Sequence, residues 1–399
     1  MTDDSRRFLI KTAAALAALP GLARAVPQVA EPALASSAPA VNGFAASSAE
    51  GPLELINLIE LEAQAAKVIA PGAFSYIARG AGDEWTLRDN RNAFNRQLII
   101  PRVLSGEGPP DLRTQILGTP IASPIIITPV AAHGLAHVSA EAGTARGAAA
   151  AGTILGVSTV STLNLEQVAA AANGPKWFQL YMLQDVEYSA QLLRRAKAAG
   201  YKAVVLTADT TVVGNREDGQ RQRFTFPLKP GNLLGDDPHA PIPPARQAFA
   251  VRIDQKTIEF AIRESGLPVI VKGISHPDDA LKAIEAGASG IQVSNHGGRQ
   301  LDGAPGAFSV LPAVAKAVKR QVPIIFDSGI RRGQDVFKAL ASGADVVAIG
   351  RPVLYGLALG GAQGVQAVLQ HLNRELSITM QLAGTQTVAD IKATVLQPA

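Results

Sequence analysis

Short apolar runs rich in valine and isoleucine alternate with alanine-rich stretches along most of the chain beyond residue 123. We interpret the runs as strands buried on both faces and the stretches between them as helices, for example at residues 186–199, 277–286 and 332–342. Eight runs occur, at residues 124–130, 153–159, 177–181, 203–209, 268–274, 290–297, 323–329 and 345–351. Eight strand–helix units predict an α/β fold of the (β/α)8 TIM-barrel type.

An open, doubly wound sheet is the alternative architecture. Such a sheet usually has a glycine-rich turn after its first strand, and this sequence has none there. Helix formers at residues 53–70 and 72–94, with Pro71-Gly72 between them, predict a helical extension before the barrel. Residues 210–251, between the fourth and fifth predicted strands, contain several prolines and glycines and no long apolar period. A connection of that length over a barrel predicts a mobile lid.

The first 25 residues have the order of a secretory leader. Arg6 and Arg7 precede an apolar run at residues 12–22, and an Ala-Arg-Ala triplet follows at residues 23–25. Paired arginines of this kind resemble a bacterial twin-arginine signal, which directs folded proteins across the inner membrane. We therefore predict a signal peptide at residues 1–25 and a periplasmic protein, or a cytoplasmic one if the leader does not function.

Composition narrows the class of protein. Residues 26–50, rich in alanine, serine and proline, predict a flexible linker before a domain at residues 51–399. The net charge is only +4, and no basic run with interleaved aromatics occurs, so no nucleic-acid partner is predicted. No apolar stretch reaches the roughly 20 residues that span a bilayer, so no transmembrane segment is predicted. The chain has no cysteine, which excludes disulfides and thiolate metal sites, and we predict no metal.

Polar residues occur at the C-terminal end of every predicted strand, where barrel enzymes carry their active sites. A single polar strand end is often a structural cap, but eight together predict an active site. The residues are His133, Ser158, Thr159, Gln179, Tyr181, Thr207, Asp209, Lys272, Ser294, Asn295, His296, Asp327, Ser328 and Arg351.

Two loops suggest the chemistry. FDSGIRRG (326–333) and GADVVAIGRPV (343–353) follow strands seven and eight with glycines and arginines, which is typical of a phosphate site in a barrel. In NHGGRQ (295–300), His296 can accept a proton near neutral pH, and Arg299 can hold a carboxylate through two parallel hydrogen bonds.

Three further residues fit the same chemistry. Asp209 can stabilise a charged imidazole, and Arg216 is a second cation for the same carboxylate. Lys272 is compatible with two roles, the Schiff-base nucleophile of an aldolase or a fixed positive charge beside an anionic cofactor ring. The residues alone leave both roles open.

From about Leu53 to its end, the chain resembles the FMN-dependent L-2-hydroxy-acid oxidase and dehydrogenase family, and the L-lactate oxidases most of all. The matching stretches reach every strand end of the predicted barrel. They are FSYIARGAGDEWTLRDN (74–90), TPVAAHGLAH (128–137), WFQLYM (177–182), LTADTTVVGNRE (206–217), VKGI (271–274), VSNHGGRQLDGAPG (293–306), FDSGIRRG (326–333) and IGRPV (349–353).

The resemblance implies a role for each matched position. His296 is the expected base, supported by Asp209, and Lys272 is the expected fixed charge beside the flavin ring. The substrate carboxylate and hydroxyl are expected to contact Tyr76, Tyr181, Arg216 and Arg299. The expected FMN contacts are Pro129, Val130, Ala131, Ser158, Gln179, Thr207 and Ser294 at the ring, and Asp327, Ser328, Gly329, Arg331, Gly350 and Arg351 at the ribityl chain and phosphate.

The reaction implied is oxidation of an L-2-hydroxy acid, L-lactate to pyruvate above all, with reduction of O2 to H2O2. A dehydrogenase that passes electrons to a quinone or cytochrome is the alternative and would suit a periplasmic protein, whereas Ala131 favours the oxidase. A Schiff-base lyase using Lys272 is a more distant alternative. The resemblance also implies a homotetramer. One departure concerns the lid, because residues 217–252 contain no tyrosine where similar lactate oxidases have one.

Overall fold

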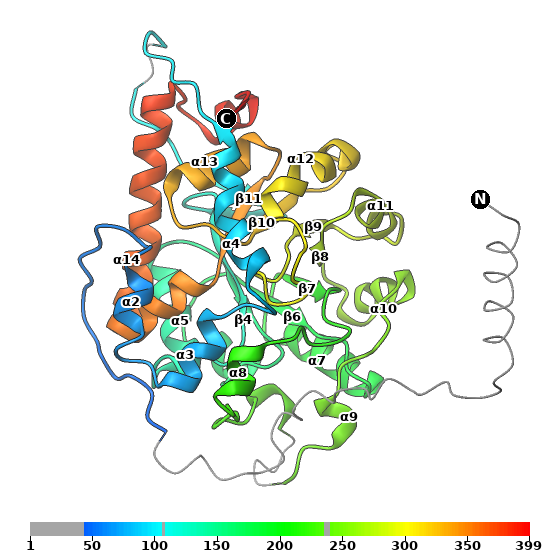
Figure 1. Ribbon diagram of the computed structural model, residues 1–399. Helices are drawn as coiled ribbons and strands as arrows, with labels where there is room; N and C mark the ends of the chain where they lie inside the picture. The colour runs from blue at the N-terminus through cyan, green and yellow to red at the C-terminus, as the bar shows by residue number, and fades with distance from the viewer. Residues whose placement is uncertain (1–43, 106–107, 235–239) are drawn as a thin grey trace, which may run out of the picture. The chain divides into compact units, whose positions relative to one another are not determined.

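Eight parallel strands close into a barrel in the computed structural model, which describes residues 44–105, 108–234 and 240–399 (Figure 1). The last strand pairs with the first, with Ile349 opposite Ile127, so the sheet has no edge. The predicted (β/α)8 barrel is therefore confirmed. Its strands are β4 (Ile125–Val130), β5 (Leu155–Val157), β6 (Lys176–Leu180), β7 (Ala203–Thr207), β8 (Val269–Ile274), β9 (Gly290–Val293), β10 (Ile324–Asp327) and β11 (Val346–Ile349).

Alternate strand residues face two different cores, which explains why the runs are apolar throughout. Ile126, Trp177 and Ile270 belong to a cluster that fills the barrel interior. Their neighbours Ile125 and Phe178 belong to a larger cluster between the strands and the surrounding helices. Burial on both sides leaves the strand ends as the place for polar chemistry.

The helices that surround the barrel follow the strands in the expected order. The three helices named from sequence are found with nearly the predicted bounds, as α7, α11 and α13. The set is α5 (Ala140–Ala150), α6 (Leu165–Ala170), α7 (Val186–Ala198), α10 (Gln255–Ser265), α11 (Pro277–Glu285), α12 (Ala307–Val318), α13 (Gly333–Ala341) and α14 (Arg351–Ala383).

Helix α14 is much longer than the others and lies along α5 and α13 (Figure 1). Gly360 and Gly361 have non-helical backbone angles and kink it. Among the described residues, α14 alone has the length and hydropathy of a membrane-crossing helix, yet 72% of its most apolar window is buried inside the protein. This burial is typical of a core helix.

The N-terminal extension is helical as predicted, but the predicted helix bounds are wrong. Only α2 (Leu61–Ala65) forms within the first predicted helix. The second divides into α3 (Pro71–Ala78), α4 (Trp85–Asn92) and the short 3-10 helix η1 (Ala93–Arg96). Pro71 begins α3 because a proline at the first helical position loses no hydrogen bond. Gly82, at φ +52, lies in the turn that separates α3 from α4.

Residues just before the predicted domain start at residue 51 contact the rest of the chain. Ser47 forms a β-bridge with His137, and the Val138 N–H donates to the Ser47 carbonyl at 2.9 Å. His137 Nε2 also lies 3.1 Å from the Ala49 carbonyl oxygen. Two of these contacts join backbone groups and the third uses the His137 ring, so no apolar pattern reports them; residues of the predicted linker therefore contact the segment after β4. The predicted leader and the rest of the linker lie outside the described residues.

The lid contains short helices, and several of its residues form hydrogen bonds to the rest of the chain. It includes α8 (Glu217–Arg221), the 3-10 helix η3 (Gly231–Leu233) and α9 (Pro244–Gln247). Asn232 is buried and donates to the Ser158 carbonyl at 3.0 Å, while the Ala250 N–H donates to the Met182 carbonyl at 2.7 Å. At its start, α8 lies beside α3 (Figure 1), where the Ser75 hydroxyl donates to Asp218.

Two small antiparallel sheets were not predicted. One joins β1 (Gln97–Leu98) to β12 (Gln397–Pro398) near the end of the chain. The other is a hairpin of β2 (Thr114–Ile116) and β3 (Thr119–Ile121), whose isoleucines Ile116 and Ile121 pack into the interior cluster of the barrel. The hairpin therefore covers the N-terminal end of the barrel, opposite the predicted site.

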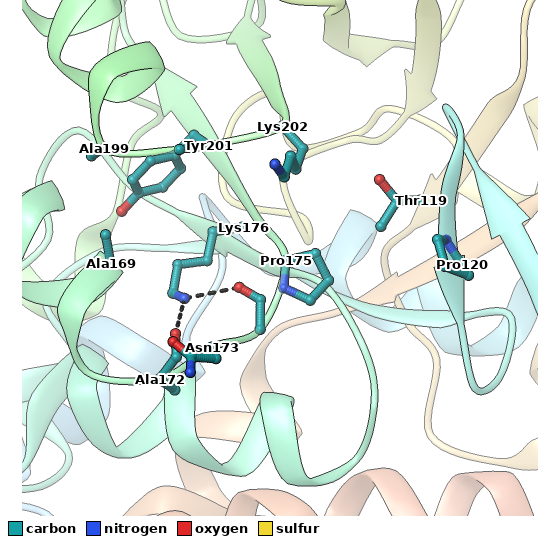
Figure 2. A pocket seen from close by; sticks show the side chains of 12 residues that line it. Thr119, Pro120, Ala169, Ala172, Asn173, Pro175, Lys176, Ala199, Tyr201 and Lys202 are labelled. Atoms are coloured by element: carbon teal, nitrogen blue, oxygen red, sulfur yellow. Dashed lines mark hydrogen bonds between the residues drawn. The ribbon is translucent and has the colours of Figure 1, made fainter.

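A pocket of about 440 Å³ also lies at that N-terminal end (Figure 2). It is lined by Thr119 and Pro120 of the hairpin and by the segments that precede β6 and β7. Lys176 is its buried charged residue, and its Nζ donates to the carbonyl oxygens of Ala172 and Gly174 at 2.5 and 2.9 Å. The carbonyls already take up this charge, so the pocket offers no clear ligand chemistry.

Candidate active site

His296, Asp209 and Tyr181 meet at the C-terminal mouth of the barrel. His296 Nδ1 lies 2.9 Å from Asp209 Oδ1, and His296 Nε2 lies 3.3 Å from the Tyr181 hydroxyl. Thr210 donates its hydroxyl to the same Asp209 oxygen at 3.0 Å. The side chains of His296 and Asp209 are only 16% and 13% exposed, so the pair lies largely out of water. A histidine held this way through Nδ1 presents Nε2 to a ligand.

The electrostatics suit a neutral base beside an ionised carboxylate. Burial lowers the pKa of His296 below its usual 6.5, and Lys272 and Arg216 reinforce this against the opposing effect of Asp209. Burial disfavours the Asp209 carboxylate, but His296, Lys272 and the Thr210 hydroxyl outweigh it and lower the pKa of Asp209 below its usual range. Burial, with Tyr76 and Asp209 nearby, raises the pKa of Tyr181, so its phenol stays protonated.

His296 itself has a strained backbone, with φ +58 in the left-handed region. Its N–H donates to Ser294 Oγ at 3.1 Å, and the Gly297 N–H donates to Ser328 Oγ at 3.1 Å. The Asn295 and Asn90 side-chain amides exchange hydrogen bonds of 2.7 and 2.9 Å, which tie this loop to α4. Asn90 was missed from the sequence because its partner is remote along the chain.

Arg299 and Arg216, the predicted carboxylate-binding pair, lie beside Tyr76 and Tyr181. The Arg299 guanidinium donates to the carbonyls of Tyr76 and Arg79 at 2.5 and 3.0 Å, and its Cζ lies 4.9 Å from the centre of the Tyr76 ring. These carbonyls belong to the C-terminal end of α3, which favours cations. Burial, then the neighbouring Arg216, lowers the pKa of Arg299, so this desolvated cation favours an anionic ligand.

A buried polar network lies beneath these residues. Lys272 Nζ donates to Ser294 Oγ at 3.0 Å and lies 3.9 Å from Asp327 Oδ2. Asp327 also accepts from Ser294 Oγ at 2.6 Å, from Ser328 Oγ at 2.7 Å and from Gln292 Nε2 at 2.6 Å. This arrangement is that of a fixed positive charge rather than a free amine nucleophile. Gln292, buried inside a strand, was not singled out from the sequence.

The residues predicted to line the cofactor ring form a second connected wall. Ser158 Oγ donates to Gln179 Oε1 at 3.1 Å, and Gln179 Nε2 donates to Thr207 Oγ1 at 3.0 Å, which joins β5, β6 and β7. Pro129, Val130 and Ala131 are only half-buried at the end of β4, as expected for residues beside a ligand.

The residues predicted to hold the phosphate include two buried arginines, Arg331 and Arg351. Burial lowers the pKa of Arg331 and of Arg351, and neither guanidinium forms an ion pair among the described residues. Arg331 donates to the Ile330 carbonyl at 2.9 Å, and Arg351 donates to the Ile77 and Gly297 carbonyls at 3.0 Å each. Two buried cations with no carboxylate in ion-pair contact among the described residues fit a phosphate group.

The backbone of the loop after β10 is held by the first turn of α13. Asp335, in the first turn of α13, accepts the N–H groups of Arg331 and Arg332 at 2.9 and 3.0 Å. Those N–H groups are therefore not free to bind phosphate, and Arg331 can contribute only its side chain. Gly329, at φ +89, approaches the backbone of Asn90 closely and also accepts from Arg91. Gly350 precedes α14 as expected.

The lid supplies phenylalanines where a tyrosine was missing. Phe224 and Phe226 pack on the Tyr76 ring, with centroids 5.9 and 4.6 Å away. Phe249, at the other end of the lid, stacks on Tyr181 at 4.5 Å. Both tyrosines predicted to contact substrate are therefore backed by apolar rings from the lid.

The barrel and the chemistry at its mouth are those of a (β/α)8-barrel oxidoreductase. The chain belongs to the FMN-dependent dehydrogenase family, which matches residues 65–398. FMN is accordingly its cofactor, and the desolvated cations and half-buried strand ends fit that group. The predictions of family, enzyme class and cofactor are confirmed, and the Schiff-base lyase loses its support.

Named relatives agree with this assignment. The chain is 51% identical to an L-lactate oxidase of Lentilactobacillus hilgardii over 88% of this chain and 97% of that protein. It is 48% identical to an L-lactate oxidase of Streptococcus iniae, over 88% of this chain and 87% of that protein. A solved structure described as a lactate oxidase of Pediococcus acidilactici has a TM-score of 0.86 at 50% identity, and the match covers 90% and 99% of the two chains.

Proposed function

We propose that this protein oxidises L-lactate to pyruvate and reduces O2 to H2O2. The observation that carries the proposal is the buried chain of hydrogen-bonded groups from Asp209 through His296 to Tyr181 beside two arginines. The identity to L-lactate oxidases supports the choice of acid. The phenylalanines of the lid provide an apolar surface beside Tyr76, which is compatible with an apolar substrate side chain such as a methyl group.

In this mechanism the arginines orient the acid. Arg216 and Arg299 hold the carboxylate, and Tyr181 donates a hydrogen bond to the substrate because its phenol stays protonated. The hydroxyl then lies within reach of His296 Nε2, which accepts its proton. Asp209 stabilises the imidazolium that results through the 2.9 Å contact to Nδ1. FMN supplies the two-electron oxidant that no side chain of this chain provides.

The direct test is the visible flavin spectrum of the purified protein as L-lactate is added without oxygen, followed by air. Bleaching followed by rapid recovery and H2O2 formation is expected. Bleaching that persists in air would identify a dehydrogenase with a quinone or cytochrome acceptor. No bleaching with L-lactate, but bleaching with another L-2-hydroxy acid, would place the error in the choice of substrate.

The pH dependence should report the neutral form of His296. Because burial lowers the pKa of His296, the active base persists below pH 6.5 and is lost only as the pH falls through the lowered value. We expect kcat/KM for L-lactate to decline on the acid side with an inflection below 6.5. A profile that already declines above pH 6.5 would contradict the neutral-base assignment.

We also propose that residues 1–25 direct export to the periplasm by the twin-arginine route. The support is the order of paired arginines, apolar run and small-residue triplet. In a bacterium that has this route, Arg6→Lys with Arg7→Lys should move the protein from the periplasmic to the cytoplasmic fraction. An unchanged distribution would refute the proposal, and a cytoplasmic wild-type protein would mean that the leader does not function.

A homotetramer is proposed from the family resemblance. Light scattering of the purified holoenzyme should give about four times the chain mass of 41.4 kDa, less any leader removed. A monomeric mass at micromolar concentration would contradict it.

A further inference from the structure

Gln300 joins the two loops that carry the base and the arginines. It follows Arg299 in the loop after β9, and its side chain reaches into the loop after β7. Nε2 donates to the carbonyls of Asp209 and Val212 at 2.6 and 2.9 Å. Oε1 accepts from the Gly214 N–H at 3.2 Å and from Arg216 Nη2 at 3.4 Å.

All hydrogen-bonding positions of this amide are used within one short segment. Two carbonyls face its NH2 group, and two N–H donors face its oxygen, so only one orientation of the amide satisfies the four partners. A glutamate could not donate to the carbonyls of Asp209 and Val212, and an apolar side chain would lose all four contacts. The position therefore requires a neutral amide of this length.

The backbones of the two loops also touch at this point. A Cβ added at Gly214 would lie 2.4 Å from the Arg299 carbonyl oxygen and 2.5 Å from that of Gln300. Arg216 Nε additionally contacts the Arg299 carbonyl at 3.5 Å. The location of Arg216 relative to Arg299 is thus set by contacts between the loops, with the Gln300 amide at their centre.

We propose that Gln300 is a positioning residue that places Arg216, and through the Asp209 backbone the base, for substrate binding. The inference rests on the proposed function, because Arg216 is taken as one cation for the substrate carboxylate. The Gln300 side chain contacts neither the expected substrate position nor the residues predicted to line the cofactor ring. Its replacement should therefore weaken binding of the carboxylate before it affects other steps.

The test compares Gln300→Met with the wild-type holoenzyme, using acetate as a non-oxidisable carboxylate probe. Acetate binding is followed by the perturbation of the visible flavin spectrum, which needs no turnover. We expect the Kd for acetate and the KM for L-lactate to rise together by about tenfold, and the limiting rate of flavin reduction to fall less. Retained flavin spectrum and an unchanged Tm establish that the variant is folded.

Gln321→Met is the matched control, since Gln321 donates to the Val318 carbonyl at 3.1 Å, outside the site. It should leave the acetate Kd unchanged. In an Arg216→Met background, Gln300→Met should add little further loss, because the residue it positions is gone. If Gln300→Met does not fold, Gln300→Asn replaces it; it keeps a neutral amide but is one methylene too short for these partners, so acetate binding should still weaken.

The inference is overturned if acetate Kd and KM stay at wild-type values in a folded variant, or if the loss is additive with that of Arg216→Met. Failure of the proposed function would look different, since L-lactate would then not reduce the wild-type flavin. The acetate comparison would still report the placement of Arg216 in that case.

Discussion

Replacing His296 with glutamine is expected to leave FMN bound and to slow reduction of the flavin by L-lactate by about 10²- to 10⁴-fold, the usual contribution of a general base. Glutamine retains hydrogen-bonding groups for Asp209 and Tyr181 but cannot accept a proton. Lys272, the cofactor wall and the arginines at the phosphate end are untouched, so the yellow colour should remain. Rapid anaerobic mixing with L-lactate, followed at the visible flavin band, measures the rate.

His276→Gln is the matched control, because His276 is an exposed cap at the start of α11 and should leave the rate unchanged. A normal rate in the His296 variant would show that another group takes the proton. Tyr181 would then be the nearest candidate, but burial raises its pKa, so its phenolate is scarce at neutral pH. A rate restored only at high pH would point to Tyr181.

The sequence predicted the barrel well because a strand that is buried on both faces appears as a continuous run of apolar residues. Seven of the eight strands lie within their predicted apolar runs, and β6 begins one residue earlier, at Lys176; the polar residues at the strand ends converge as the fold requires. Asp209 and His296 are separated by 87 residues, yet their positions after strands β7 and β9 sufficed to predict their meeting. Topology, rather than local propensity, made the site predictable.

What the sequence could not predict depends on contacts between remote backbones and side chains. No local sequence pattern indicates the two reciprocal hydrogen bonds between the side chains of Asn90 and Asn295. The same holds for the hydrogen bonds from Arg299 to the end of α3. Asp335 is a similar case, because the sequence does not show that this carboxylate, in the first turn of α13, accepts the N–H groups of Arg331 and Arg332. The helix bounds before the barrel failed because only Leu61–Ala65 of the first predicted helix is helical, and the turn that contains Gly82 divides the second.

Gly273→Ala is expected to damage both stability and activity through one added methyl group. Gly273 follows Lys272 with φ +103, a conformation that L-residues rarely adopt. A Cβ there would lie 2.6 Å from Asp209 Cβ and 2.7 Å from its Cγ, so Asp209 must move. We expect the free energy of unfolding to fall by about 1–3 kcal/mol and flavin reduction by L-lactate to slow at least tenfold, as the contact to His296 Nδ1 lengthens.

Gly200→Ala separates the cost of a positive φ from the effect of the contact with Asp209. Gly200 has φ +84, and nothing lies within 4 Å of an added Cβ. It should carry the backbone cost of a positive φ and keep the wild-type reduction rate. Denaturant unfolding of both holoenzymes and anaerobic reduction by L-lactate provide the comparison. If both variants lose similar stability and both keep the wild-type rate, the close approach of Gly273 to Asp209 does not position the base. If only Gly273→Ala slows reduction, the space that this glycine leaves is what allows Asp209 to reach His296.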